Sequence, residues 1–267
     1  MAELKLSPTD AANLLIESRD PITEHKKKSS DPVPLTKSVT LEFANKTISS
    51  LAKVTTKDDK VGAALTSDLN ILIVTGSRVP DYGRYNLRPN RTLSWQGDEE
   101  KQIKDLTKPW RLKDFHSGFV LHAARVLKFL DGHVPDFIIG HSLGAASAQI
   151  LGNHLNVPTI CLASPQVIKQ NIIDKEKMRE PSNEQWKILN IAWKQDTVTS
   201  ILRPLKYRCL GHRVVFQKSN LGMDHFVKQY RDMIKKAEKH QITDADGNPR
   251  ELPKKWHSTE LPIKEKS

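Results

Sequence analysis

The chain has 267 residues, of which 37% are hydrophobic and 6% aromatic, a composition typical of a mostly folded protein with one α/β domain and polar ends. Its formal net charge of +11 favours anionic partners such as phospholipid headgroups, but no nucleic-acid-binding motif accompanies the charge, so nucleic acid is not expected as a partner. Only Cys161 and Cys209 are present, which are too few for a disulfide framework and lack zinc-type spacing. Neither a metal nor a cofactor is expected.

No segment predicts a signal peptide or a membrane span. The N-terminus lacks a basic start followed by an apolar run, and no stretch approaches the roughly 20 apolar residues that cross a bilayer. We therefore expect a cytoplasmic protein, with unconventional secretion left open.

The two ends of the chain differ from its middle. Residues 1–45 contain several prolines and a lysine run, and they predict a short helix around Ala11–Ser18 followed by an irregular polar connector, the whole segment being loosely packed. Residues 241–267 combine turn residues with alternating charge, which is typical of a tail. The predicted organisation is thus a polar extension over 1–45, an α/β domain over 46–240 and a tail over 241–267.

Within the domain, short apolar runs alternate with longer helical patterns. Continuous apolar runs joined by helices predict a mostly parallel central sheet with helices on both faces. The predicted strands are Leu69–Val74, Phe137–Ile139, Val157–Ala163, Ile188–Trp193 and Arg213–Phe216. The predicted helices are Gly118–Leu130, Leu143–Leu155 and Asp224–Lys239. In the last helix, the residues expected to face the core are Phe226, Tyr230, Met233 and Ile234.

A possible nucleophile follows the second predicted strand. Residues 140–144, GHSLG, match G-x-S-x-G, in which the serine occupies a strained strand-to-helix turn of an α/β-hydrolase fold. The flanking glycines keep side chains out of the tight turn. Ser142 is then the candidate nucleophile, and the N–H of Leu143 at the helix start is a candidate oxyanion donor. The alternative is a chance match that only forms a turn.

A serine nucleophile needs a histidine base, which in this fold follows an acidic residue in the chain. His225, at a predicted loop-to-helix junction, is the favoured base, and His212, which begins a predicted strand, is the alternative. His154 would face away, in the helix after the nucleophile, while His240 and His257 lie at or beyond the last helix.

Asp196 is the favoured acid because it follows the strand Ile188–Trp193, at the sheet edge where the active site of such a fold lies. Asp224 is interpreted as a helix N-cap. The remaining carboxylates of this region lie in a charged segment with no strand before it, and they are interpreted as solvated: Asp174, Glu176, Glu180 and Glu184.

Several of these motifs together resemble the class 3 lipases, the family of fungal triacylglycerol lipases and their relatives. The resemblance covers about residues 60–235. Its elements are GHSLGAA at Gly140–Ala146, ASPQV at Ala163–Val167, QDTVTSI at Gln195–Ile201, DH at Asp224–His225, TGSR at Thr75–Arg78 and FHSGF at Phe115–Phe119. The sequence departs from the family pattern at Thr75 and Gln166, where arginine is usual, and in the short interval of 225 − 196 = 29 residues between acid and base.

The resemblance implies an α/β-hydrolase fold, with Ser77 N–H as the second oxyanion donor and residues 79–115 as a cover over the site that can act as a lid. It further implies a hydrolase, lipase or esterase in lipid metabolism or degradation, acting on a lipid or phospholipid acyl ester through Ser142, His225 and Asp196. A peripheral contact with an anionic membrane surface fits the net charge. The alternative from another class is a non-catalytic α/β-hydrolase-like module that binds lipid or protein.

Overall fold

The computed structural model describes part of the chain, and the following account is confined to that part. The described residues are 4–25, 31–56, 59–76, 103–108, 111–169, 187–193, 196–200, 207–216, 225–239, 242–243 and 249–250.

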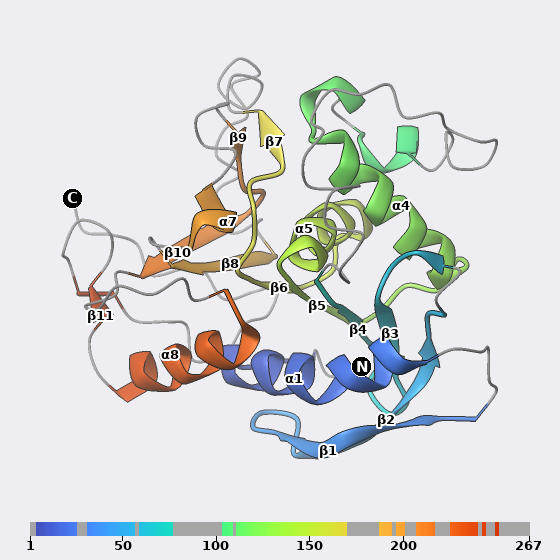
Figure 1. Ribbon diagram of the computed structural model, residues 1–267, viewed down its shortest axis with the longest axis vertical. Helices are drawn as coiled ribbons and strands as arrows, with labels where there is room; N and C mark the ends of the chain where they lie inside the picture. The colour runs from blue at the N-terminus through green and yellow to red at the C-terminus, as the bar shows by residue number, and fades with distance from the viewer. Residues whose placement is uncertain are drawn as a thin grey trace.

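A sheet of eight strands, in the order β1-β2-β3-β4-β5-β6-β8-β10, runs through the centre of this part of the molecule (Figure 1). The strands are β1 (Val33–Leu41), β2 (Lys46–Val54), β3 (Ala63–Thr66), β4 (Ile71–Val74), β5 (Phe137–His141), β6 (Thr159–Leu162), β8 (Ile188–Trp193) and β10 (His212–Phe216). Strands β4 to β10 pair in parallel, whereas β1 to β4 pair antiparallel. The prediction of a mostly parallel sheet is therefore confirmed, and each of the five predicted strands is present with ends shifted by at most two residues.

Helices cover both faces of the sheet, as predicted. They are α1 (Pro8–Glu24), α4 (Ser117–Leu130), α5 (Leu143–Leu155), the single turn α7 (Thr197–Ser200) and α8 (Val227–Lys239), with a 3-10 turn η2 (Leu112–Asp114). Two small strand pairs, β7 (Ile168–Lys169) with β9 (Tyr207–Arg208) and β11 (Ile242–Thr243) with β12 (Pro249–Arg250), lie outside the main sheet.

The core consists of two apolar layers, one on each face of the sheet. Ile138 of β5 belongs to the layer beneath α4 and α5, whereas its neighbours Phe137 and Ile139 belong to the layer beneath α1 and α8. This alternation follows from the two-residue period of a strand. Both faces are apolar, and with the sharp strand-to-helix turn at Ser142 after β5 the arrangement is that of an α/β-hydrolase fold.

The prediction of loose packing for residues 1–45 is wrong where the structure describes them. α1 spans 17 residues, and Leu14, Leu15 and Ile22 are at most 1% exposed in the layer that it shares with α8. Ser7 and Asp10 form a capping box, which starts the helix earlier than the apolar pattern alone indicates. The predicted domain boundaries at residues 45 and 240 stay predictions.

The hairpin of β1 and β2 was not predicted from the sequence. Its pairing shifts register between Pro34 and Val39, and the pairing of β2 with β3 shifts between Leu51 and Lys53. Such irregularities break the alternation of apolar and polar residues by which a strand is recognised. Pro34 is accommodated because β1 lies at the edge of the sheet.

One residue of the predicted helix Asp224–Lys239 was assigned to the wrong environment. Tyr230, Met233 and Ile234 are buried as predicted, but the side chain of Phe226 is 61% exposed. Phe226 precedes the first helical residue, Val227, so helical periodicity does not govern its direction.

Most of the predicted cover, residues 79–115, lies outside the described residues. In the described remainder, Ile103, Leu106 and Phe115 are at most 2% exposed and belong to the core layer beneath α4 and α5. Among the described helices, none has the length and apolar character needed to cross a membrane.

A buried polar contact joins α4 to α5. His122 Nδ1 lies 2.7 Å from Ser147 Oγ, and the two residues are 2% and 0% exposed. Burial lowers the pKa of His122 to about 3, with a smaller contribution from the positive charge of Arg125. His122 is therefore neutral in the folded protein at pH values where the unfolded chain binds a proton.

This difference predicts a stability loss in mild acid. When the pH falls from 7.5 to 5, His122 binds a proton in the unfolded state but not in the folded state. This difference lowers the free energy of unfolding by about 2 kcal/mol. His122→Asn keeps a polar atom near the position of Nδ1 and removes the titration, so its free energy of unfolding should fall about 2 kcal/mol less than that of the wild type over this range. Urea unfolding at both pH values measures the difference; equal losses in the two proteins would contradict it.

Candidate active site

Ser142 occupies a strained turn between β5 and α5. Its backbone has φ 57° and ψ −124°, a conformation that non-glycine residues rarely adopt and that costs about 1–3 kcal/mol. Ser142 N–H donates to Leu162 O at 3.0 Å, and Ser142 O accepts from Ala146 N–H at 3.1 Å. The turn is thus tied both to the neighbouring strand β6 and to the first turn of α5.

Glycine is needed on both sides of Ser142 because backbone packs against each position. A Cβ at Gly140 would lie 2.7 Å from Gly144 O, and a Cβ at Gly144 would lie 2.3 Å from Val74 O. The steric role predicted for the two glycines is therefore confirmed. Gly76, after β4, is also adjacent to the serine, since a Cβ there would lie 3.1 Å from Ser142 Cβ.

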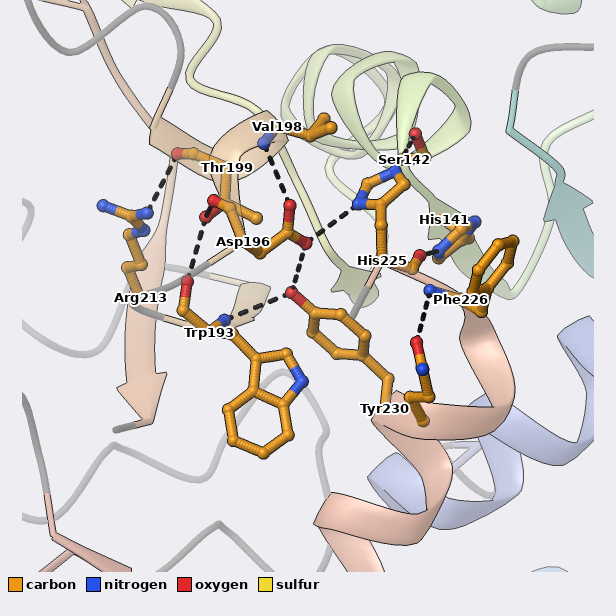
Figure 2. A network of polar contacts seen from close by, with 11 residues as sticks. His141, Ser142, Trp193, Asp196, Val198, Thr199, Arg213, His225, Phe226 and Tyr230 are labelled. Carbon is orange, nitrogen blue, oxygen red and sulfur yellow. Dashed lines mark hydrogen bonds and ion pairs between the residues drawn. The ribbon is translucent and has the colours of Figure 1, made fainter. Parts of the chain in front are cut away.

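His225 lies between Ser142 and Asp196 (Figure 2). Its Nε2 is 2.6 Å from Ser142 Oγ, and its Nδ1 is 2.8 Å from Asp196 Oδ2. The side chain of Asp196 is 1% exposed, Ser142 is 5% exposed, and the histidine side chain retains 28% exposure. The structure therefore brings together the three residues that the sequence analysis selected, with the histidine partly exposed to solvent and the aspartate buried.

Strand polarity explains why these residues meet. Ser142 follows β5, Asp196 follows β8, and His225 follows β10 after residues outside the described part; because these strands are parallel, all three residues lie beyond carboxyl ends at one edge of the sheet. His212 is the first residue of β10 and so lies at the opposite edge. The interval of 29 residues between Asp196 and His225 is sufficient because β10, the one described strand of the main sheet within it, lies directly beside β8.

Asp196 accepts further hydrogen bonds from groups that the sequence analysis did not assign to the site. Val198 N–H donates to Oδ1 at 2.9 Å, and the Tyr230 hydroxyl donates to Oδ2 at 2.8 Å. The Tyr230 oxygen in turn accepts from Trp193 N–H at 3.1 Å. The sequence analysis placed Tyr230 in the core; the available signal was that a buried tyrosine hydroxyl requires a hydrogen-bond partner.

The backbone around the acid is held by a second set of contacts. Thr199 donates to Asp196 O through its N–H at 3.2 Å and through Oγ1 at 2.9 Å, and Oγ1 also lies 3.2 Å from Trp193 O. The guanidinium of Arg213, on β10, donates to Thr199 O at 3.1 Å. These bonds fix the turn that presents the carboxylate to His225.

Of the two candidate oxyanion donors, Leu143 and Ser77, the described residues include only Leu143. Leu143 is the first residue of α5, so its N–H belongs to the first helical turn, whose amides have no acceptor within the helix. Ser77 lies outside the described residues; Gly76, which precedes it in the sequence, lies beside Ser142. Among the described residues, no group of three or more His, Cys, Asp or Glu side chains is arranged to hold a metal ion.

Comparison with known proteins gives similarity of fold. Neither the known family models nor the curated protein sequences match this chain. The solved structures similar to it include Lip2 lipase from Yarrowia lipolytica (16% identity, TM-score 0.38, 59% of this chain and 61% of that one), lipase II from Rhizopus niveus (14%, 0.35, 62% and 63%) and a triacylglycerol lipase from Penicillium expansum (13%, 0.34, 80% and 81%). The chain thus matches less than two thirds of the length of the first two lipases.

The contacts of Tyr230 predict that its hydroxyl orients the acid. Tyr230→Phe removes the donor to Asp196 and leaves Trp193 N–H without this acceptor, so the rate of covalent labelling of Ser142 by a fluorophosphonate should fall about 10-fold. Tyr207→Phe is the control, because Tyr207 is also buried but is not among the hydrogen-bond donors to Asp196 described above. This variant should label at the wild-type rate. Equal labelling rates for Tyr230→Phe and the wild type would contradict an orienting role.

Proposed function

We propose that the chain is a serine hydrolase that cleaves carboxylic esters through an acyl-enzyme. The observation that supports this most is the position of His225, within hydrogen-bond distance of both Ser142 Oγ and Asp196 Oδ2. A hydroxyl is a weak nucleophile near neutral pH, and a base held by a carboxylate is the usual means of activating it. Metal and organic cofactors have no part in this chemistry.

In the proposed reaction, Ser142 Oγ attacks the ester carbonyl carbon while its proton moves to His225 Nε2. Asp196 accepts the Nδ1–H of His225 and stabilises the imidazolium that forms. Collapse of the tetrahedral intermediate breaks the bond to the alcohol oxygen, which takes the proton from Nε2. Water then attacks the acyl-enzyme by the same sequence of proton transfers and releases the carboxylic acid.

The proposed oxyanion donors are the N–H groups of Leu143 and Ser77. A donor that is already in place when charge develops on the carbonyl oxygen contributes about 3 kcal/mol to lowering the barrier. The start of α5 adds the positive end of the helix dipole. The packing of Gly76 against Ser142 supports the proximity of the second donor.

For the substrate, we propose a lipid or phospholipid acyl ester at an anionic membrane surface. The net charge of +11 supports attraction to such a surface. Beside the base, Phe226 exposes 61% of its side chain, and Lys228, two residues further along, is also exposed. An exposed aromatic next to a cation suits the boundary between acyl chains and phosphate headgroups.

The competing function is a non-catalytic module that binds lipid or protein. A binding module has no need to keep a nucleophile, a base and an acid aligned, nor to keep a non-glycine residue in the strained backbone conformation of Ser142. These two features favour the enzyme, and serine reactivity separates the alternatives.

Fluorophosphonate labelling tests the proposed mechanism. Wild-type protein should be labelled, Ser142→Ala should not, and His225→Ala should label at least about 100-fold more slowly because the general base is lost. His212→Ala is the matched control and should label at the wild-type rate, since His212 lies at the other edge of the sheet. Hydrolysis of acyl esters of graded chain length should follow the same ranking. Wild-type protein that is not labelled, with or without lipid, would favour the binding module.

Vesicle binding tests the proposed membrane contact. Phe226→Ser should weaken binding to phosphatidylglycerol-containing vesicles about 10- to 100-fold, because an inserted phenyl ring contributes roughly 1.5–3 kcal/mol. Val134→Ser is the matched control: Val134 is 54% exposed but precedes β5, at the opposite edge of the sheet, and the change should have no effect. Co-sedimentation at low salt measures both. Equal binding by the two variants, or wild-type binding that is indifferent to phosphatidylglycerol, would contradict the proposal.

A further inference from the structure

The side chain that immediately precedes the nucleophile contacts the backbone of the base. His141 is the last residue of β5, and its Nε2 lies 2.8 Å from the carbonyl oxygen of His225 (Figure 2). A carbonyl oxygen only accepts hydrogen bonds, so the Nε2 of His141 carries the hydrogen and donates it. The His141 ring packs against the rings of His225 and Tyr230, with centroids 5.2 Å and 6.5 Å apart.

His141 is held in this neutral form across the ordinary pH range. Burial, with smaller contributions from the charges of His225 and Arg19, lowers its pKa to about 3 against the opposing effects of the His225 carbonyl and Asp196. Since only the neutral tautomer with hydrogen on Nε2 fits the carbonyl, Nδ1 is left unprotonated, on the side where Gly76 approaches. The contact therefore does not change when His225 gains a proton during the proposed reaction.

The backbone of His225 lies just outside the hydrogen-bond ladder of α8. In the first turn of that helix, the amides of Gln229 and Tyr230 both donate to Phe226 O, at 3.0 Å and 3.2 Å. These bonds fix the peptide after Phe226. The carbonyl of His225, one residue earlier, accepts instead from His141. The peptide that carries the base is thus oriented by a side chain of the central sheet.

We propose that His141 is a positioning residue that fixes the backbone of His225 relative to Ser142. Because His141 and Ser142 are consecutive, one rigid turn carries both the nucleophile and the donor that anchors the base. An error in the position of the His225 peptide is transmitted to Nε2, whose distance to Ser142 Oγ is 2.6 Å. A misplacement of about 1 Å at a reacting group can lower a rate by about 100-fold. This inference rests on the proposed function of the triad.

The geometry of amide side chains provides a discriminating set of variants. The amide nitrogen of glutamine reaches about as far as histidine Nε2, whereas the amide nitrogen of asparagine reaches only about as far as Nδ1. His141→Gln can therefore donate to the His225 carbonyl, but His141→Asn falls short and His141→Leu has no donor. All three variants lose the imidazole ring, so a difference among them reports the donor and its reach.

The test compares labelling rates and steady-state kinetics with a short-chain p-nitrophenyl ester. His141→Leu and His141→Asn should lower both the labelling rate and kcat about 10- to 100-fold with KM changed less than about 3-fold, while His141→Gln should remain within about 5-fold of the wild type. Urea unfolding of each variant allows the comparison to be made on folded protein. A purely structural role would instead make the rates follow stability, whatever the reach of the donor.

The outcomes separate this inference from the proposed function. A wild-type protein that is neither labelled nor active would overturn the proposed function itself. A wild type that is labelled, with Asn, Leu and Gln variants that are folded and label alike, would leave the function standing and overturn the role of His141. A labelling rank of wild type, then Gln, then Asn and Leu together, supports it.

Discussion

The close approach of α5 to the end of β4 is the constraint on which the candidate site depends. At Gly144, the helix backbone lies so near the carbonyls of Val74 and Thr75 that no Cβ fits. This approach forces the sharp turn in which Ser142 takes a positive φ, at a cost of about 1–3 kcal/mol. The burial of most side chains of α5 offsets that strain. The conformation of Ser142 is therefore maintained by the packing of the helix that follows it.

The other two members of the proposed triad, His225 and Asp196, depend on the opposite face of the sheet. His225 is carried by the residue pair just before α8, and α8 packs on α1 through a layer that includes Ile22 and Ile234. Tyr230 belongs to that layer with its ring and to the site with its hydroxyl. The geometry of the site therefore depends on core packing. A change that shifts α8 against α1 would move both His225 and the Tyr230 hydroxyl that donates to Asp196.

Sequence patterns predicted the parts of the molecule whose information is local. α5 matches its predicted bounds because glycines and a continuous small-residue run define it. Ser142 and Asp196 were selected because each follows a predicted strand, and His225 because it lies at a predicted loop-to-helix junction, in the chain order of the fold. The β1–β2 hairpin and the burial of α1 were missed because register shifts and tertiary contacts, not periodicity, decide them. Tyr230 and His141 were missed for a related reason: their polar atoms meet partners 34 and 84 residues away in sequence.

The protonation states around the triad point to a single route for the proton in the proposed reaction. Burial, reinforced by the charge of Asp196, raises the pKa of Tyr230 well above its usual value, and burial lowers that of His141 to about 3. Tyr230 and His141 are then both neutral hydrogen-bond donors. Tyr230 donates to Asp196, and His141 donates to the His225 carbonyl. Of the groups in this network, only His225 can exchange a proton with Ser142 and the leaving oxygen, and the imidazolium that forms faces one carboxylate. The neutral donors thus orient the ion pair without competing for its proton.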